Sequence, residues 1–266
     1  MLNNIFLKTL RDQRRSLLMW GVYLVAIGVI MALFYPTISK MSAFNQYLSQ
    51  LPESLKAMFG PGIADYTSPA GYYSSELFSF MVPLLLLVFG IGFGANTIAG
   101  EEEKGTLGFL LTNPVPRWRV VADKFAVLVV SMIALGFLFW AGLAVASSAM
   151  SIHISTLKLA EATLGACALA LVFASVAFLA GCVKGSKGLS MGVSSGLAVL
   201  TYLLYTLGGM VNGLKNYRFL SPFYHYMEPD TLNKGLSPMH VIVLLVLALI
   251  FFIVSLPAFI RRDIAR

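Results

Sequence analysis

The sequence predicts an all-α polytopic membrane protein with six transmembrane helices. Hydrophobic residues make up 58% of its 266 residues, charged residues make up only 12%, and the mean hydropathy is +0.81. An ordinary soluble domain carries about 25% charged residues. Six apolar runs each reach the roughly 20 residues that a helix needs to cross the hydrocarbon core. The runs are continuous, so they lack the alternation that a transmembrane β-barrel requires.

The six expected spans form one transmembrane domain over residues 1–266. They cover residues 17–38, 77–99, 125–149, 160–183, 189–211 and 241–260. The residues between them fall into short pieces, so we expect no separate soluble domain within this sequence.

Residues 1–16 precede the first span and carry both apolar and basic side chains. On a helix, Leu2, Ile5 and Phe6 fall near one face, whereas Lys8 and Arg11 fall mostly on the other. This pattern predicts an N-terminal amphipathic helix that lies in the cytoplasmic interface of the membrane. An unstructured basic flank beside the first span is the alternative.

Basic residues are divided unevenly between the two sides of the membrane. With both termini on one side, that side holds thirteen of the 19 Lys and Arg residues, whereas the acidic residues divide evenly. The thirteen are Lys8, Arg11, Arg14, Arg15, Lys104, Arg117, Arg119, Lys124, Lys184, Lys187, Arg261, Arg262 and Arg266. Since Lys and Arg concentrate in cytoplasmic connections, both termini are expected in the cytoplasm. The net charge of +7 then reflects topology, and we expect no nucleic-acid partner.

Residues 100–124 form an expected cytoplasmic segment between the second and third spans. Its three glutamates, residues 101–103, would begin a short helix, where the backbone dipole favours negative charge. The side chains expected to share one face are Thr106, Leu107, Leu110 and Leu111. Pro114 and Pro116 would end the helix. We expect an exposed helix parallel to the membrane that is suited to binding a soluble partner.

The connection before the last span, residues 212–239, is expected on the outer side and is rich in aromatic residues. These are Tyr217, Phe219, Phe223, Tyr224 and Tyr226. Aromatic side chains commonly lie at the level of the lipid headgroups. The same residues also suit a short helix that dips back into the outer leaflet near the mouth of a pathway. The sequence leaves both alternatives open.

Small residues recur at helical spacing in the fifth span. Gly188, Gly192 and Gly196 follow one another every four residues, so they line one helix face and allow another backbone to approach closely. We expect a tight helix contact at this glycine stripe. The contact could lie within the subunit or across a dimer, and the sequence does not decide between them.

Ionisable residues are almost absent from the span interiors. Ion-coupled secondary transporters usually place such residues in mid-membrane, so this alternative is disfavoured. The mildly polar residues that could line a pathway between the second and fifth spans are Asn96, Ser194, Thr201, Tyr202 and Tyr205. Such a pathway would be largely apolar and would suit a drug, a lipid or an amphipathic peptide. Simple helix contacts are an equally good explanation of these residues.

The sequence contains few motifs suited to catalysis, nucleotide binding or metal binding. It lacks the GxxxxGK[ST] loop that binds nucleotide phosphates, so this chain has no recognisable means of binding ATP by itself. Gly192 to Gly196 match the GxSxG pattern of serine hydrolases, but that pattern requires a strand-turn-helix context and a histidine base. No cluster suits a metal. We expect no catalytic residue, metal or cofactor; an intramembrane enzyme remains the alternative, although an EExxxR motif fails at Thr106 and Leu107.

The run from Gly100 to Thr106 closely resembles a signature of ABC-2 type permeases, found between their second and third spans. The other residues that carry this resemblance are Leu110, Leu111, Pro114, Val115, Pro116, Arg117 and Lys124. The six spans, the amphipathic N-terminal helix and the aromatic outer loop extend the resemblance over the whole chain. Val115 and Pro116 depart slightly from the small residue that usually precedes the arginine.

The resemblance implies the transmembrane subunit of a type V ABC exporter in the plasma membrane. It implies a coupling helix that docks on a separate ATPase chain, with ATP and Mg bound there. The residues carried over as coupling contacts are Glu101, Glu102, Glu103, Gly105, Thr106, Leu110 and Arg117. It also implies two ATPase chains and a second permease subunit, which would form a homodimer.

Overall fold

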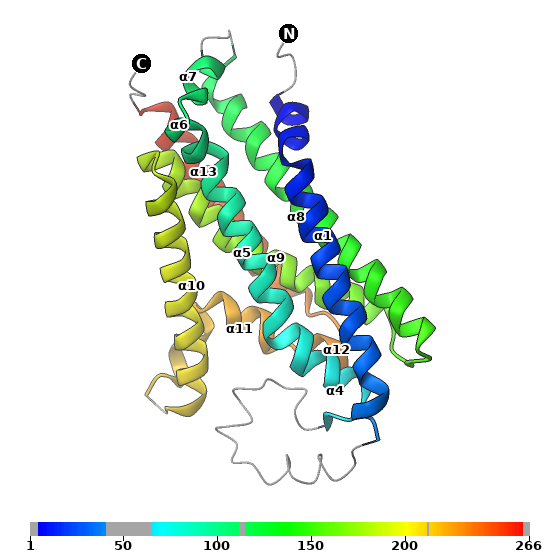
Figure 1. Cartoon of the computed structure of the whole chain (residues 1–266). Coiled ribbons are helices and arrows are strands. Elements are labelled where there is room, and N and C mark those ends of the chain that lie inside the picture. Colours follow the sequence, from blue (N-terminus) through cyan, green and yellow to red (C-terminus); the bar gives the residue numbers. More distant parts are fainter. Residues whose placement is uncertain (1–4, 41–64, 112–114, 212, 263–266) are drawn as a thin grey trace.

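The computed structural model describes residues 5–40, 65–111, 115–211 and 213–262, and the regular structure in them is helical. Six of its helices are long and apolar enough to cross a membrane, which confirms the predicted fold class. They are α1 (Ile5–Ile38), a composite helix over Pro69–Glu103, α8 (Arg117–Ala149), α9 (Thr156–Lys184), α10 (Lys187–Met210) and α13 (Pro238–Ile260). Figure 1 shows them running along one another in a single bundle.

The second span is a composite of α-helical and π-helical segments. In chain order these are α4 (Pro69–Tyr73), the π-helix η2 (Ser74–Met81), α5 (Val82–Ala95), the π-helix η3 (Asn96–Gly100) and α6 (Glu101–Glu103). A π-helical turn changes the backbone bonding pattern and is frequent at functional sites. The second span therefore has an irregular segment near each of its ends.

The fourth span, α9, lies at the centre of the bundle. It packs against α5, α8, α10 and α13, and most of its side chains are buried. Small residues make this possible, because they allow neighbouring backbones to approach closely. At Gly94 of α5 a β-carbon would overlap the carbonyl group of Ala174. Helix α1 instead packs along α8, at the edge of the bundle.

The two ends of the described chain lie at the same end of the bundle, together with α6 and α7 (Thr106–Leu111) (Figure 1). We call this the terminal end and the opposite one the distal end. Within residues 1–16, the described residues from Ile5 onward continue into the first span as one helix. They do not form a separate element. The stretch contains neither Gly nor Pro, so nothing interrupts the helix there.

The expected outer loop, residues 212–239, folds at the distal end as three short helices. These are η4 (Lys215–Leu220), α11 (Pro222–Met227) and α12 (Thr231–Lys234), and residue 212 lies outside the described part. On α11 the Phe223 ring lies 5.6 Å from that of Phe173, near the middle of α9. Since α11 reaches this depth, the structure favours the second alternative, a short helix that dips back among the spans.

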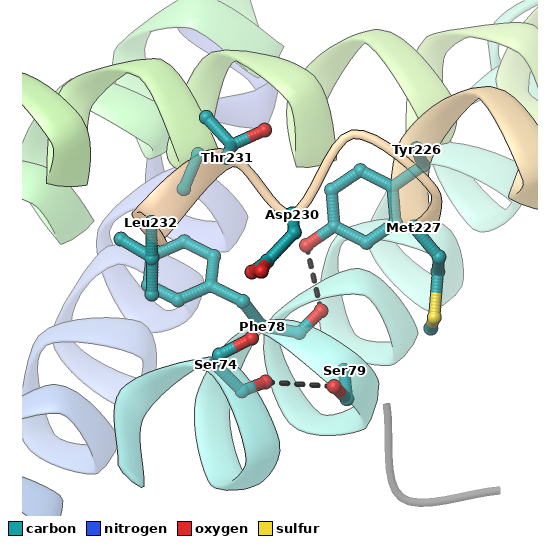
Figure 2. A pocket seen from close by; sticks show the side chains of 9 residues that line it. Ser74, Phe78, Ser79, Tyr226, Met227, Asp230, Thr231 and Leu232 are labelled. Carbon is teal, nitrogen blue, oxygen red and sulfur yellow. Dashed lines mark hydrogen bonds between the residues drawn. The ribbon is translucent and has the colours of Figure 1, made fainter. Parts of the chain in front are cut away.

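A hydrogen bond to the π-helical segment η2 holds α11 in place. Figure 2 shows the Tyr226 hydroxyl donating to the Phe78 carbonyl oxygen at 2.7 Å. The Ser79 hydroxyl donates to the Ser74 carbonyl oxygen within η2. The cavity beside these bonds measures about 30 Å³, which leaves room for water but not for a drug, a lipid or a peptide. It is therefore a packing feature and not a substrate site.

Candidate functional site: a charged cluster at the terminal end

The three glutamates of the expected coupling segment lie at the end of the second span. The expectation that they begin a new helix is wrong, because α6 continues directly from η3. The break comes one residue later, at Lys104 and Gly105, where Gly105 has a φ of 70°. The C-terminal end of a helix carries partial negative charge, so carboxylates there need positive partners.

Glu101 is paired with a lysine of the third span. Its Oε1 lies 2.6 Å from the Lys124 Nζ, and the Lys124 side chain is only 1% exposed. The same ammonium group donates to the Thr97 carbonyl oxygen at 2.7 Å, within the π-helical segment η3. Lys124 therefore fastens α8 to the irregular end of the second span.

Glu102 is paired with Arg262, which follows the last span. The guanidinium also donates to the carbonyl oxygens of Gly181 and Cys182, at 3.4 and 3.3 Å. These carbonyls lie in the last turn of α9, whose backbone ends at Gly185 with a φ of 63°. Positive side chains are favoured at such a helix end. Three spans thus meet at one ion pair.

Glu103 binds the start of the fifth span. Its Oε1 accepts a hydrogen bond from the Lys187 backbone N–H at 2.7 Å, at the first residue of α10. Unpaired N–H groups and the helix dipole make this end a favourable place for a carboxylate. Ser186 caps the same end by accepting from the Leu189 N–H.

Arg117 completes this arrangement from the start of α8. Its Nη1 donates to the carbonyl oxygens of Ile260 and Arg262, at 3.2 and 2.9 Å. We define the terminal cluster as six side chains. They are Glu101, Glu102, Glu103, Arg117, Lys124 and Arg262. The cluster joins the second span to α8, α9, α10 and α13.

The rest of the expected coupling segment offers the exposed surface. Gly105 and Thr106 are exposed, and the Thr106 hydroxyl donates to the Glu101 carbonyl oxygen at 3.0 Å. Leu107 is buried, and Gly108 is exposed with open space around it. The Leu110 side chain and residues 112–114 lie outside the described part. Residues 117–124 belong to the helix of the third span rather than to a separate segment.

The model of the family described as ABC-2 family transporter protein matches residues 3–264. This chain belongs to the ABC-2 transporter family. It is therefore the membrane subunit of an ABC transporter, a permease that generally works with an ABC ATPase partner. No curated protein matches the permease.

The permease has an apolar cavity between its second and fifth spans. The cavity measures about 200 Å³. Its lining residues are Ser79, Phe80, Pro83, Leu84, Leu87, Ala198, Val199, Tyr202 and Phe223. Only Ser79 and the Tyr202 hydroxyl are polar, so the cavity suits hydrocarbon. The second and fifth spans of the predicted pathway thus do enclose a space, at the distal half of the bundle.

Of the five residues expected to line a pathway, Tyr202 lines this cavity. Ser194 is buried and donates to the Phe173 carbonyl oxygen at 2.6 Å, which is a helix contact. The Thr201 hydroxyl donates to the Leu197 carbonyl oxygen of its own helix. Tyr205 lies under the Arg218 guanidinium at 4.7 Å, and Asn96 belongs to η3 near the terminal end. The helix-contact alternative therefore accounts for Ser194 and Thr201.

The glycine stripe does not pack within the subunit. Gly188, Gly192 and Gly196 are exposed, and a β-carbon added at any of them would meet nothing within 4 Å. The opposite face of α10 is the buried one, with Ser190 and Ser194 against the bundle. An internal contact of the stripe is thus ruled out for the described residues.

Sequence reasoning missed three features of this site. It did not pair Lys124 or Arg262 with the glutamates, and it gave no role to Gly185. The available signals were a lysine at the edge of an apolar run and a glycine directly after a helix. Among the residues that the structure describes, no three His, Cys, Asp or Glu side chains gather as a metal site.

Proposed function

We propose that this permease forms the translocation pathway of an ATP-driven exporter and receives its energy at the terminal cluster. The observation that carries the proposal is the bonding of Glu101, Glu102 and Glu103, each to a different span. A partner that moves the end of the second span would move the ends of α8, α9, α10 and α13 with it. A soluble ATPase has access to the adjoining exposed residues of α7.

ATP would be bound and hydrolysed on another chain. The sequence has no phosphate-binding loop, so ATP and Mg would be bound by two ATPase subunits. They would dock at the terminal end, and the excess of Lys and Arg there supports a cytoplasmic position for it. Both termini would then lie in the cytoplasm, and the protein would lie in the plasma membrane. Gly105, Thr106 and the α7 backbone are the docking contacts in this proposal. Glu101 and Glu102 act behind them as internal connections.

The second permease subunit would be a second copy of this chain, packed against the glycine stripe. Val199 lines the cavity and lies three residues from Gly196 and seven from Gly192, on the same face of α10. A dimer formed across the stripe therefore brings the two cavities beside the subunit boundary. A pathway lined in this way suits a hydrophobic or amphipathic substrate such as a drug, a lipid or a peptide.

Co-purification tests the energy source. A phosphate-loop ATPase should be retained with the permease in a mild detergent and should hydrolyse ATP faster when a transported apolar compound is added. A permease that transports in sealed vesicles without ATP, or under an ion gradient alone, would contradict the proposal.

A substitution on α7 tests the docking surface. Gly108→Glu places a charge in open space, so the permease should fold normally. Burying that unpaired charge under a partner should lower the amount of ATPase retained by about tenfold. Gly213→Glu is the matched control, since Gly213 also has open space but lies at the distal end. Equal ATPase retention by the two variants would exclude α7 from the docking surface.

A bulky side chain on the stripe tests the dimer. Gly192→Leu should leave the fold of the subunit intact, because nothing lies within 4 Å, and should weaken the dimer by about 1–3 kcal/mol through overpacking. Light scattering and cross-linking in nanodiscs measure the dimer fraction. Gly94→Leu is the contrasting variant: it should prevent folding, because its side chain would overlap α9. An unchanged dimer fraction for Gly192→Leu would place the interface elsewhere.

A further inference from the structure

Two histidines meet at the distal end, where α11 reaches the start of α13. The Nδ1 atoms of His225 and His240 lie 3.1 Å apart, and their ring centroids lie 5.2 Å apart. On its other side, His225 Nε2 lies 3.0 Å from the Phe219 carbonyl oxygen. Because a carbonyl oxygen can only accept, His225 Nε2 must carry a proton.

That bond determines where the protons of the neutral pair lie. A neutral imidazole has one N–H, so His225 Nδ1 is the acceptor and His240 Nδ1 is the donor. One further proton can bind at His240 Nε2 without loss of the bond between the rings. A second further proton would give both Nδ1 atoms an N–H, and two donors at this distance repel each other. The contact between the rings therefore tolerates one added proton but not two.

The surroundings offer little to offset a second charge. No carboxylate of the described residues pairs with either ring. On η4, which packs against α11, Arg218 pairs with Glu228. Its guanidinium lies over the rings of Tyr205 and Tyr224, at 4.7 and 5.8 Å, so it places a positive charge and not a negative one near the pair. On α9, Glu161 accepts from the Leu236 N–H. Tyr224 contacts both imidazole rings through its own ring.

Burial of His225 also acts against a second charge. It lowers the pKa of His225; the bond to the Phe219 carbonyl opposes this, and the neighbouring His240 adds to the lowering. Since the folded state disfavours the charged ring, the stability of this contact is complete above the ordinary histidine pKa of about 6.5 and falls as the pH drops below it.

The histidine pair is one of a few side-chain bonds that hold α11. Tyr226 also donates to the Phe78 carbonyl oxygen, and Ser221 donates to the Thr201 carbonyl oxygen, at 2.7 and 2.8 Å. Two residues before His225, Phe223 lines the apolar cavity and packs edge-on against Tyr202 at 5.3 Å. A movement of α11 at His225 would therefore also move Phe223, which forms part of the cavity wall.

We propose that His225 and His240 form a proton-controlled latch, which holds α11 against α13 until both rings are charged and then releases it. Acidification of the distal side would thereby open access to the apolar cavity. The latch itself does not depend on what is transported; only its consequence for transport rests on the proposed function.

Accessibility of a cavity residue tests the latch in the full-length permease in nanodiscs. Leu87 lines the cavity and is buried, so a Leu87→Cys reporter should react slowly with a water-soluble thiol reagent. Its rate is divided by that of an exposed Lys40→Cys reporter, which removes the general effect of pH on thiols. Between about pH 7.5 and about pH 5 this ratio should rise about tenfold, the factor that the loss of one hydrogen bond gives.

Three substitutions of histidine separate the latch from a structural role. His240→Phe keeps the aromatic ring but cannot bind His225, so the ratio should be high at both pH values. His240→Asn offers an amide N–H and gains no charge, so the ratio should stay low at both. His153→Gln is the matched control, since the exposed His153 is the third histidine of the chain and should leave the pH response unchanged.

A wild-type ratio that is equal at both pH values would overturn the proposal, as would a full pH response in His240→Asn. The unsubstituted protein provides a check that depends on no variant. With ¹⁵N-labelled histidine, imidazole spectra at about pH 7.5 should show an Nε2–H tautomer for His225 and an Nδ1–H tautomer for His240. The same tautomer in both rings would also overturn it. Neither result depends on ATP, so a failure of the latch leaves the proposed function untouched.

Discussion

Replacing Glu101 by alanine should be the most damaging single change at the terminal cluster. The Lys124 ammonium group would lose a counter-charge at 2.6 Å while its side chain remains only 1% exposed. Removing one partner of a buried ion pair costs about 3–5 kcal/mol, because the other charge stays buried without compensation. We expect the free energy of unfolding to fall by about this amount. The buried thiols of Cys167 and Cys182 report the loss, since a thiol-reactive dye should reach them at a lower temperature.

Lys124→Met provides the matched comparison. The Glu101 side chain is 27% exposed, so water can hydrate its carboxylate once the ammonium group is gone. The loss should therefore be smaller than for Glu101→Ala. The double variant should regain a large part of the stability that Glu101→Ala loses, because no buried charge remains. Equal losses in the two single variants and no recovery in the double variant would show that the pair does not act as described.

Replacing Gly185 should have the second largest effect. This residue ends α9 with a φ of 63°, where a side chain costs about 1–2 kcal/mol. A β-carbon would also overlap the paired side chains of Arg262 and Glu102, which lie directly against the glycine. Since hydrogen bonds to charged groups contribute about 1.5–3 kcal/mol, Gly185→Ala should lose both contributions. Dye-monitored thermal unfolding in detergent measures the sum.

Gly105 separates the two contributions. It has a φ of 70°, close to that of Gly185, but nothing lies within 4 Å of an added β-carbon. Gly105→Ala should therefore lose only the backbone contribution, about 1–2 kcal/mol. The difference between the two variants measures the disturbance of the ion pair. No difference between them would contradict a role for Gly185 in making room for Arg262 and Glu102.

The terminal cluster changes how this segment can be probed. The sequence predicts that all three glutamates begin an exposed helix suited to a soluble partner. Glu101 and Glu102 instead hold spans together, so a charge-reversing substitution at either residue would disturb the fold as well as any docking. Exposed positions such as Gly108 separate docking from folding.

Much of the fold follows from local properties of the chain. Six apolar runs of span length give six membrane helices, because a backbone in hydrocarbon must satisfy its own hydrogen bonds. The signature around Gly100 resembles that of ABC-2 permeases, and the family match over residues 3–264 confirms it. The glycine stripe was also visible as a helix face.

Partner choice between distant residues could not be predicted in the same way. Glu101 meets Lys124, Glu102 meets Arg262 and Glu103 meets the start of α10, and no local pattern specifies these pairs. The assumption that a run of glutamates starts a helix failed because α6 continues the second span. Only one of five expected pathway residues, Tyr202, lines the cavity, since the polar groups of Ser194 and Thr201 are satisfied by backbone carbonyls.

The sequence by itself determined the class of protein, the number of spans and the family, since these depend on hydropathy and on a short contiguous motif. Only the tertiary structure decided that α9 is central, that the glycine stripe faces outward, and that α11 folds back against the middle of α9. The physical reason is the same in each case. Helix rotation and the pairing of charges depend on contacts between segments far apart in the chain, which local periodicity does not encode.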